Sequence, residues 1–280
     1  MLLINIFIFI FGTFLGSFLN VCIYRLPRNI SIINPRSFCP HCNNTIYFYD
    51  NIPIISFLIL RAKCRYCNKK ISFRYPLVEF ISGIVLLFLY LKFGIGLDFF
   101  KYLFLFYFLI VVSFIDIDFH AIPNYLCFLG ILIGIIFSIF ETANFLSHNF
   151  YFNFWKLPIV RDIKNLIFGF GFVYLFKFFG DSFLEIYLSF SKKDSIEGER
   201  ESLGLGDVDF MGLVGLFLGI ESVILVFFIA PFFAVIYGIF AIIFKRSHLI
   251  PYLPYLSLAV VVVFFYKTQI LSLLRLYIGG

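Results

Sequence analysis

Charged side chains are scarce in this chain, and their scarcity excludes a water-soluble globular protein. Only 14% of the 280 residues are Asp, Glu, Lys or Arg, whereas 62% are hydrophobic and 22% are aromatic. The mean hydropathy is +1.00. Soluble domains carry about 25% charged residues. The composition therefore predicts an all-α polytopic membrane protein with about eight transmembrane helices of roughly 20 residues each.

Other absences narrow the class further. No Lys or Arg occurs between Met1 and Asn20, so the first apolar run lacks the basic start of a cleavable signal peptide and is expected to stay as a helix. The chain has neither His-Glu-x-x-His nor Gly-x-Ser-x-Gly, which argues against a metalloprotease and a serine hydrolase. The net charge of +6 comes from basic residues gathered in particular loops, so we expect membrane lipid and no nucleic acid as a partner.

The apolar runs and the basic loops predict a topology. We expect spans at 3–24, 76–93, 99–118, 122–141, 162–190, 205–219, 222–244 and 252–274. The segment 25–74 holds nine Lys and Arg, so the positive-inside rule places it in the cytoplasm. If the chain crosses the membrane at each later span, two more segments also lie inside. They are 191–203, which contains Lys192, Lys193 and Arg200, and the pair Lys245-Arg246. The span 162–190 carries Lys177 and Asp181, which suggests that it is partly interfacial.

Two distant stretches each carry a pair of aspartates, Asp116 with Asp118 and Asp207 with Asp209. A charged side chain at membrane depth costs roughly 2.5–3.5 kcal/mol on insertion scales, so function is the default interpretation. Two carboxyl groups that share a proton can serve as general acid and general base towards water. The predicted topology places both pairs at the cytoplasmic face. The pattern therefore predicts an intramembrane aspartyl protease, although polar helix ends at the interface remain an alternative.

Helix geometry limits which aspartates can act together. Residues two apart on a helix project about 200° from each other, so at most one member of each pair faces a shared partner. The spacing does not say which member. Gly204 and Gly206 leave room beside Asp207 for a substrate backbone or a facing helix. Pro123 interrupts the helix after the first pair, which would keep that pair near water.

Cysteines supply the clearest metal signal. Two Cys-x-x-Cys pairs, Cys39 with Cys42 and Cys64 with Cys67, are separated by 21 residues. Four thiolates in this pattern predict a closed, structural Zn²⁺ site, a zinc-ribbon-like fold for the loop. Two disulfides are the alternative, but a reducing compartment disfavours them.

These motifs together resemble those of the bifunctional type IV prepilin peptidase family. The resemblance spans nearly the whole chain and rests on Gly16 to Pro27, both cysteine pairs, Asp50-Asn51-Ile52-Pro53, Ile71 to Glu79 and both aspartate motifs. In that family one catalytic acid is the first residue of the pattern Asp-x-x-x-x-x-Ile/Leu-Pro-Asn/Asp. The other is the last residue of Gly-x-Gly-Asp. The resemblance thus implies Asp116 and Asp207 as the catalytic pair. It also implies three parts: a first helix at 1–24, a cytoplasmic four-cysteine zinc-binding loop domain at 25–75 and a transmembrane peptidase domain at 76–280.

The resemblance implies two reactions in the inner membrane of a bacterium. Similar enzymes cut the basic leader of type IV prepilins or type II secretion pseudopilins at the cytoplasmic face, then methylate the new N-terminus with S-adenosylmethionine. Glu79 and Gly83 are candidates for binding the methyl donor, with a helix-start charge and a packing glycine as the alternative interpretation. One departure from the family is Asp209, where a Lys is common. The oligomeric state is left open.

Other classes remain to be weighed. A proton-coupled transporter also places carboxylates on helices, but no inverted repeat is visible and the carboxylates fall near one face instead of the midplane. A peptidase-only enzyme is a further alternative, although both cysteine pairs favour the bifunctional form. A presenilin-like protease shares Gly-x-Gly-Asp, yet here Ile115 precedes Asp116 where that class has Tyr.

Overall fold

The fold is known from a computed structural model, which describes residues 2–148, 153–191, 201–243 and 251–278. Lys192, Lys193, Arg200, Lys245 and Arg246, on which part of the predicted topology rests, lie outside the described residues. Within the described residues the regular structure is helical, and β-pairing is limited to isolated bridges. The predicted all-α fold class is therefore confirmed.

Seven helices among the described residues are long and apolar enough to cross a membrane. They are α1 (Leu2–Arg25), α3 (Arg74–Phe93), α4 (Leu97–Phe119), α5 (Asn124–His148), α6 (Pro158–Ser191), α8 (Ile220–Ile243) and α9 (Leu253–Ile278). The remaining expected span, 205–219, forms α7 (Leu205–Leu218), which has 14 residues. At 1.5 Å per residue it measures about 21 Å, less than the roughly 30 Å of a bilayer's hydrocarbon core.

The chain divides into two compact units, Met1–Phe119 and His120–Gly280. In the first unit α1 and α3 pack closely because small residues face each other. A Cβ atom at Gly12 would lie 2.8 Å from the Cα atom of Gly83, and one at Gly16 would lie 2.7 Å from the Cα atom of Glu79. Gly12 and Gly16 are one helical turn apart, the spacing that lets membrane helices approach backbone to backbone. Helix α4 packs on both α1 and α3.

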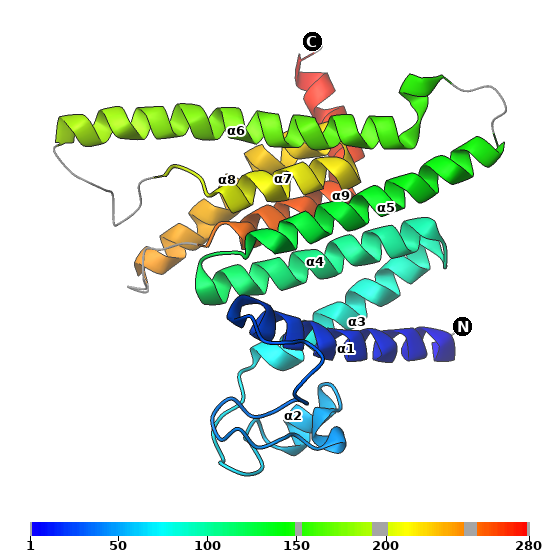
Figure 1. Ribbon diagram of the computed structural model, residues 1–280, viewed down its shortest axis with the longest axis vertical. Helices are drawn as coiled ribbons and strands as arrows, with labels where there is room; N and C mark the ends of the chain where they lie inside the picture. The colour runs from blue at the N-terminus through cyan, green and yellow to red at the C-terminus, as the bar shows by residue number, and fades with distance from the viewer. Residues whose placement is uncertain (1, 149–152, 192–200, 244–250, 279–280) are drawn as a thin grey trace. The chain divides into compact units, whose positions relative to one another are not determined.

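The segment between α1 and α3 forms a separate lobe at one end of these helices (Figure 1). It contains the short helices η1 (Leu26–Arg28), η2 (Phe48–Asn51) and α2 (Ile55–Ile59). Arg25, at the end of α1, is buried and donates hydrogen bonds to the carbonyls of Ser31 and Arg36 at 2.8 and 3.2 Å. This buried guanidinium ties the lobe to the helix from which it leaves.

The second unit is built around α7. Helix α7 contacts α5, α6, α8 and α9, and its side chains from Phe210 to Phe217 are all buried. A helix that is apolar and buried all round belongs to a protein interior. Its tightest contact is with α6, the long green helix in Figure 1: a Cβ atom at Gly215 would lie 2.3 Å from the carbonyl oxygen of Asn165, and one at Gly169 would lie 2.5 Å from that of Met211.

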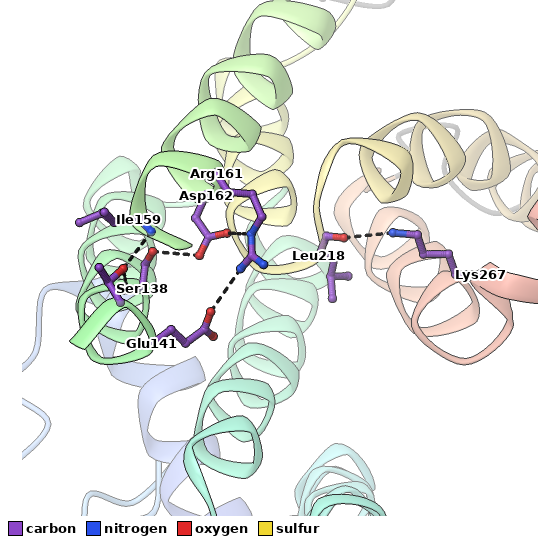
Figure 2. Close-up of polar contacts among 8 residues, drawn as sticks. Ser138, Glu141, Ile159, Arg161, Asp162, Leu218 and Lys267 are labelled. Carbon is purple, nitrogen blue, oxygen red and sulfur yellow. Dashed lines mark hydrogen bonds and ion pairs between the residues drawn. The ribbon is translucent and has the colours of Figure 1, made fainter. Parts of the chain in front are cut away.

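Polar contacts away from the aspartate motif link the helices of the second unit (Figure 2). Asp162 of α6 is 2% exposed; it accepts hydrogen bonds from Ser138 of α5 at 2.9 Å and from Arg161 at 2.8 Å. Lys267 of α9 donates to the carbonyl of Leu218, the last residue of α7, at 3.4 Å. These contacts satisfy polar groups that would otherwise be costly to bury in an apolar surrounding.

Candidate active site and metal centre

Asp116 and Asp118 lie in the last turn of α4 and have different surroundings. Asp116 is 5% exposed and follows Ile115, which is fully buried. Asp118 is on the exposed side of the helix and forms an ion pair with Arg74, the first residue of α3. The difference in exposure between the two side chains agrees with the 200° separation expected from the sequence. In this unit Asp118 holds two helix ends together, whereas Asp116 is the buried carboxyl group.

Asp207 lies in the first turn of α7. Gly204 is the N-cap residue in an extended conformation, and its carbonyl accepts the Asp207 N–H at 3.1 Å. A negative charge is stabilised near a helix N-terminus by the unpaired N–H groups there. The side chain is half-buried, and the buried Val208 and Phe210 anchor the same turn. A Cβ atom at Gly206 would meet no atom of the described residues within 4 Å, so space beside Asp207 remains open.

A cluster of polar contacts fixes the three residues that precede this turn. Lys177 of α6 is 7% exposed, and its Nζ lies 2.6 Å from the carbonyl oxygen of Leu203, 2.6 Å from Glu201 and 3.1 Å from Asp181. Asp181 in turn accepts from the N–H and the hydroxyl of Ser202 at 2.6 and 2.7 Å. We call these residues the α6 clamp: Lys177, Asp181, Glu201, Ser202 and Leu203. Because α7 begins two residues later, the clamp determines where Asp207 enters the unit.

Gly180 makes the clamp possible. A Cβ atom there would lie 2.6 Å from the hydroxyl oxygen of Ser202, so any larger residue would push the segment away. Lys177 and Asp181 were expected to mark an interfacial part of the span. Both lie within the continuous helix α6 and bind the chain that leads to the aspartate motif; the interfacial position of this part of the helix stays a prediction.

Tyr252, just before α9, is a neighbour of Asp207 that the sequence analysis did not single out. Burial raises the pKa of Tyr252 to about 12, and the negative charge of Asp207 adds to the effect. The phenol therefore keeps its proton at neutral pH and can donate it in a hydrogen bond. No motif marks this tyrosine, since it follows residues 244–250, which carry no recognisable pattern.

The four predicted metal ligands come together in the lobe. The Sγ atoms of Cys39, Cys42, Cys64 and Cys67 all lie within 4.8 Å of one another, and those of Cys39 and Cys67 are 3.9 Å apart. All four are free thiols. A disulfide requires about 2.05 Å between sulfurs, so the disulfide alternative does not describe this arrangement. A tetrahedral Zn²⁺ with Zn–S bonds of about 2.3 Å places its sulfurs about 3.8 Å apart, which the cluster matches.

Each cysteine pair sits in the same kind of turn. Cys39 and Cys64 accept hydrogen bonds through their carbonyls from the N–H groups of Asn43 and Asn68, at 2.9 and 3.0 Å. Both asparagines have φ near +55°, a left-handed conformation that Asn tolerates well. The N–H groups of Cys67 and Tyr66 lower the pKa of the Cys64 thiol to about 7. Cys64 is thus prepared to bind a metal as a thiolate.

The two candidates for the methyl donor have distinct places. Glu79 is 8% exposed, and its Oε2 accepts the N–H of Ile54 at 2.8 Å, which joins α3 to the lobe. Gly83 faces α1: a Cβ atom there would lie 2.7 Å from the ring of Phe9 and 2.9 Å from a methyl carbon of Thr13. Each residue therefore has a packing role, and their part in binding the methyl donor stays a prediction.

Comparison with known proteins agrees with this architecture. The family description "Bacterial Peptidase A24 N-terminal domain" matches residues 10–93, and "Type IV leader peptidase family" matches residues 103–239. The first match contains the cysteine lobe and Glu79, and the second contains Asp116 and Asp207. No solved structure was found to match the chain.

Relatives from several bacteria are similar over much of the chain. A protein of Bacillus subtilis named "Prepilin leader peptidase/N-methyltransferase" is 30% identical over 95% of this chain and 95% of its own length. A Vibrio cholerae protein of the same name is 31% identical over 90% of this chain and 92% of its own length. One from Myxococcus xanthus, also of that name, is 42% identical, but the match covers 48% of this chain and 40% of that protein. The chain belongs to the type IV prepilin peptidase family.

Proposed function

We propose that this chain is an intramembrane aspartyl endopeptidase that removes the basic leader of type IV prepilins or type II secretion pseudopilins and then methylates the new N-terminus. The observation that carries the proposal is the pair of carboxyl groups in the family's two aspartate motifs, Asp116 buried in the last turn of α4 and Asp207 in the first turn of α7. Family membership supports the same reactions and gives no support to the alternative of a proton-coupled transporter.

In the peptidase step, Asp116 and Asp207 share one proton. The ionised carboxylate takes a proton from a water molecule as the water attacks the scissile carbonyl carbon, while the protonated carboxyl group donates its proton to the carbonyl oxygen. The proton taken from water then passes to the leaving amine as the C–N bond breaks, and the tetrahedral hydroxyl returns its proton to the other carboxylate as the carbonyl re-forms. The meeting of these two groups is itself part of the proposal.

The cysteine cluster is proposed to hold a structural Zn²⁺. Four thiolates fill all positions of a tetrahedral ion and leave none open for water or substrate, so the metal would stabilise the lobe and take no part in chemistry. The bidentate pair of Arg65 with Asp50, at 2.6 and 2.7 Å, links the second cysteine turn to the segment that contacts Glu79. Folding of the lobe and the position of Glu79 are therefore connected.

In the second step, S-adenosylmethionine supplies a methyl group from its sulfonium. The free α-amine made by cleavage attacks the methyl carbon, the C–N bond forms as the S–C bond breaks, and the amine proton passes to solvent. We place this step at the lobe, between 25 and 75, and the peptidase step in the helices of 76–280. Both would face the cytoplasm, consistent with the basic residues of the lobe, in a multi-pass protein of the inner membrane.

One assay tests the peptidase assignment. Membranes that contain the enzyme are incubated with a prepilin and S-adenosylmethionine, and leader loss and methyl incorporation are followed for Asp116→Ala, Asp118→Ala, Asp207→Ala and Asp209→Ala. We expect that only the changes at 116 and 207 abolish cleavage. The other two serve as matched controls, since each removes a carboxylate two residues away. Full cutting by either the 116 or the 207 variant would overturn the assignment.

A further inference from the structure

Part of the cysteine lobe reaches back alongside α1 (Figure 1). A hollow of about 440 Å³ lies between the lobe and the helix, and apolar side chains from both line it. We call these residues the hollow face: Phe14 and Phe18 of α1, and Ile32, Ile33 and Phe48 of the lobe. The lobe is therefore a neighbour of the helix along its length as well as at its end.

The position of the hollow along α1 sets its depth in a membrane. The helix has 24 residues, so it measures about 36 Å at 1.5 Å per residue and exceeds the roughly 30 Å hydrocarbon core by a few ångströms. Phe18 lies about 10 Å and Phe14 about 16 Å from Arg25 along the axis. With α1 across the bilayer, both rings lie within the hydrocarbon of the leaflet on the lobe's side. The lobe residues that share the hollow with them lie at a similar depth.

The lobe side of the hollow consists of exposed apolar side chains. Ile33 is 81% exposed and Phe48 is 76% exposed. Phe14 and Phe18 are half-exposed, and they continue the apolar surface that α1 presents from Leu2 onwards. Large apolar side chains gathered around one hollow mark an interaction surface. Because this surface is continuous with the exposed side of a membrane-spanning helix, lipid is the partner that already surrounds it.

The backbone of the lobe segment in the hollow is suited to apolar surroundings. The hydroxyl oxygen of Ser31 accepts the N–H groups of Ile33 and Asn34 at 3.3 and 3.4 Å. The carbonyls of Ser31 and Arg36 accept from the buried guanidinium of Arg25. Irregular chain at membrane depth needs such partners within the protein, because lipid offers none. A loop surrounded by water has no need of a buried arginine to satisfy its carbonyls.

Amphipathic and basic groups surround the apolar hollow. Tyr47 and Tyr49, on either side of Phe48, stack with their ring centroids 5.3 Å apart, and Arg36 is an exposed cation in the wall. Tyrosine is enriched at the headgroup level of membranes, and arginine can extend from an apolar surface towards phosphate. The described residues that line the hollow include no carboxylate. An apolar centre with this rim is typical of a surface that lies in the membrane interface.

We infer that the lobe is partly immersed in the membrane leaflet on its own side, with phospholipid acyl chains in the hollow between α1 and the lobe and with Arg36 at the level of the phosphates. The inference requires that α1 spans the membrane, and it does not depend on the reactions proposed above. It changes the expected place of the cysteine cluster, since a lobe held in this way rests against the bilayer and is not a free cytoplasmic domain.

Fluorescence quenching from the lipid and from the water tests the inference. Ile33→Trp and Phe48→Trp are made one at a time in a Trp155→Phe background, which removes the chain's single tryptophan. The full-length, zinc-loaded proteins are placed in phosphatidylcholine vesicles with or without bromine on the acyl chains. Both tryptophans are expected to lose much of their fluorescence to brominated lipid and to resist quenching by iodide. Lys63→Trp, at an exposed polar position of the lobe outside the hollow, is the matched control and is expected to show the reverse.

The outcomes separate lipid from the other partners that an apolar face could bind. A monodisperse gel-filtration peak in detergent shows that each variant is folded. Quenching by bromine at 33 and 48 but not at 63 supports the inference. Equal quenching by iodide at all three positions overturns it. Bromine quenching that appears only after dilution into excess lipid would assign the face to a second copy of the chain and also overturn it. Protection from brominated lipid by added prepilin would assign the face to the substrate's apolar helix, with the same consequence.

Discussion

Replacing Lys177 tests whether the α6 clamp positions Asp207. Lys177→Met keeps most of the side chain's length but removes the ammonium, which contacts the carbonyl of Leu203 and the carboxylates of Glu201 and Asp181. The hydrogen bond to Leu203 comes from a buried charged group and should contribute about 1.5–3 kcal/mol. Glu201 is 58% exposed, so its ion pair is screened and adds at most about 1 kcal/mol.

Only part of that loss reaches the active site, because Asp181 continues to hold Ser202. If about half of the lost stabilisation is a cost of placing Asp207, the activation free energy of cleavage rises by about 1–2 kcal/mol. The kcat then falls roughly 5- to 30-fold. The KM for prepilin should change little, since the clamp residues belong to the protein's own fold. The measurement is steady-state cleavage of a purified prepilin, normalised to folded enzyme by gel filtration. Lys177→Arg should recover most of kcat, because a guanidinium keeps the charge and the donors.

Lys267→Met is the matched control. Lys267 also contacts a main-chain carbonyl of α7 and a carboxylate, Leu218 at 3.4 Å and Glu221 at 3.1 Å, but it does so at the opposite end of the helix. It should lower kcat by no more than about twofold, since its longer, more exposed contacts stabilise the unit by about 1 kcal/mol or less. Equal losses of kcat in the two variants, or full activity of Lys177→Met where Asp207→Ala is inactive, would refute the positioning role.

Three further changes have defined outcomes. Asp162→Asn should lower the free energy of unfolding by about 1–3 kcal/mol, seen as a lower Tm in detergent, because a buried charge-assisted hydrogen bond with Arg161 is weakened; cleavage per folded molecule should be unchanged, and an unchanged Tm would contradict the role given to this carboxylate. Gly215→Ala should destabilise the second unit by about 1–3 kcal/mol, because its Cβ would lie 2.3 Å from the Asn165 carbonyl, whereas Gly171→Ala, with no described atom within 4 Å, should be neutral or slightly stabilising; similar effects of both would argue against close packing of α6 on α7. Cys39→Ser should reduce bound zinc and folded yield, measured by elemental analysis and gel filtration, and an undiminished zinc content would count against the four-cysteine site.

The sequence predicted those features that depend on local pattern. Apolar runs gave the helices, because a residue's preference for lipid depends on its own chemistry and that of its near neighbours. The two Cys-x-x-Cys pairs indicated a metal site, since each pair forms one turn that can present two thiolates to a shared metal ion. The 200° rule predicted that Asp116 and Asp118 would face apart, and the structure assigns the buried side to Asp116. The helices and the 200° separation needed only residues that are close in the sequence, and the metal site needed only a short motif that occurs twice.

Features that depend on distant packing were missed. The amide of Asn20 meets the carbonyl of Tyr75 across 55 positions of sequence because Gly12 and Gly16 bring α1 against α3. Lys177 and Glu201 are 24 residues apart, and nothing in either neighbourhood indicates that they meet. In the sequence, a lysine within an apolar run is typical of the membrane interface. Its partners become visible only in the folded unit, and they add a positioning role to that interpretation.

The length of α7 explains why α6 matters so much to the proposed chemistry. Most membrane helices settle at a depth set by the match between their apolar length and the bilayer. A 14-residue helix of about 21 Å cannot be placed this way, and its buried surface from Phe210 to Phe217 faces protein. Its position must therefore come from its neighbours, chiefly from α6: the clamp at Lys177 fixes the chain before it, and Gly169 and Gly215 set its approach along its length. The position of Asp207 in the second unit is thus determined by packing against α6 and not by lipid.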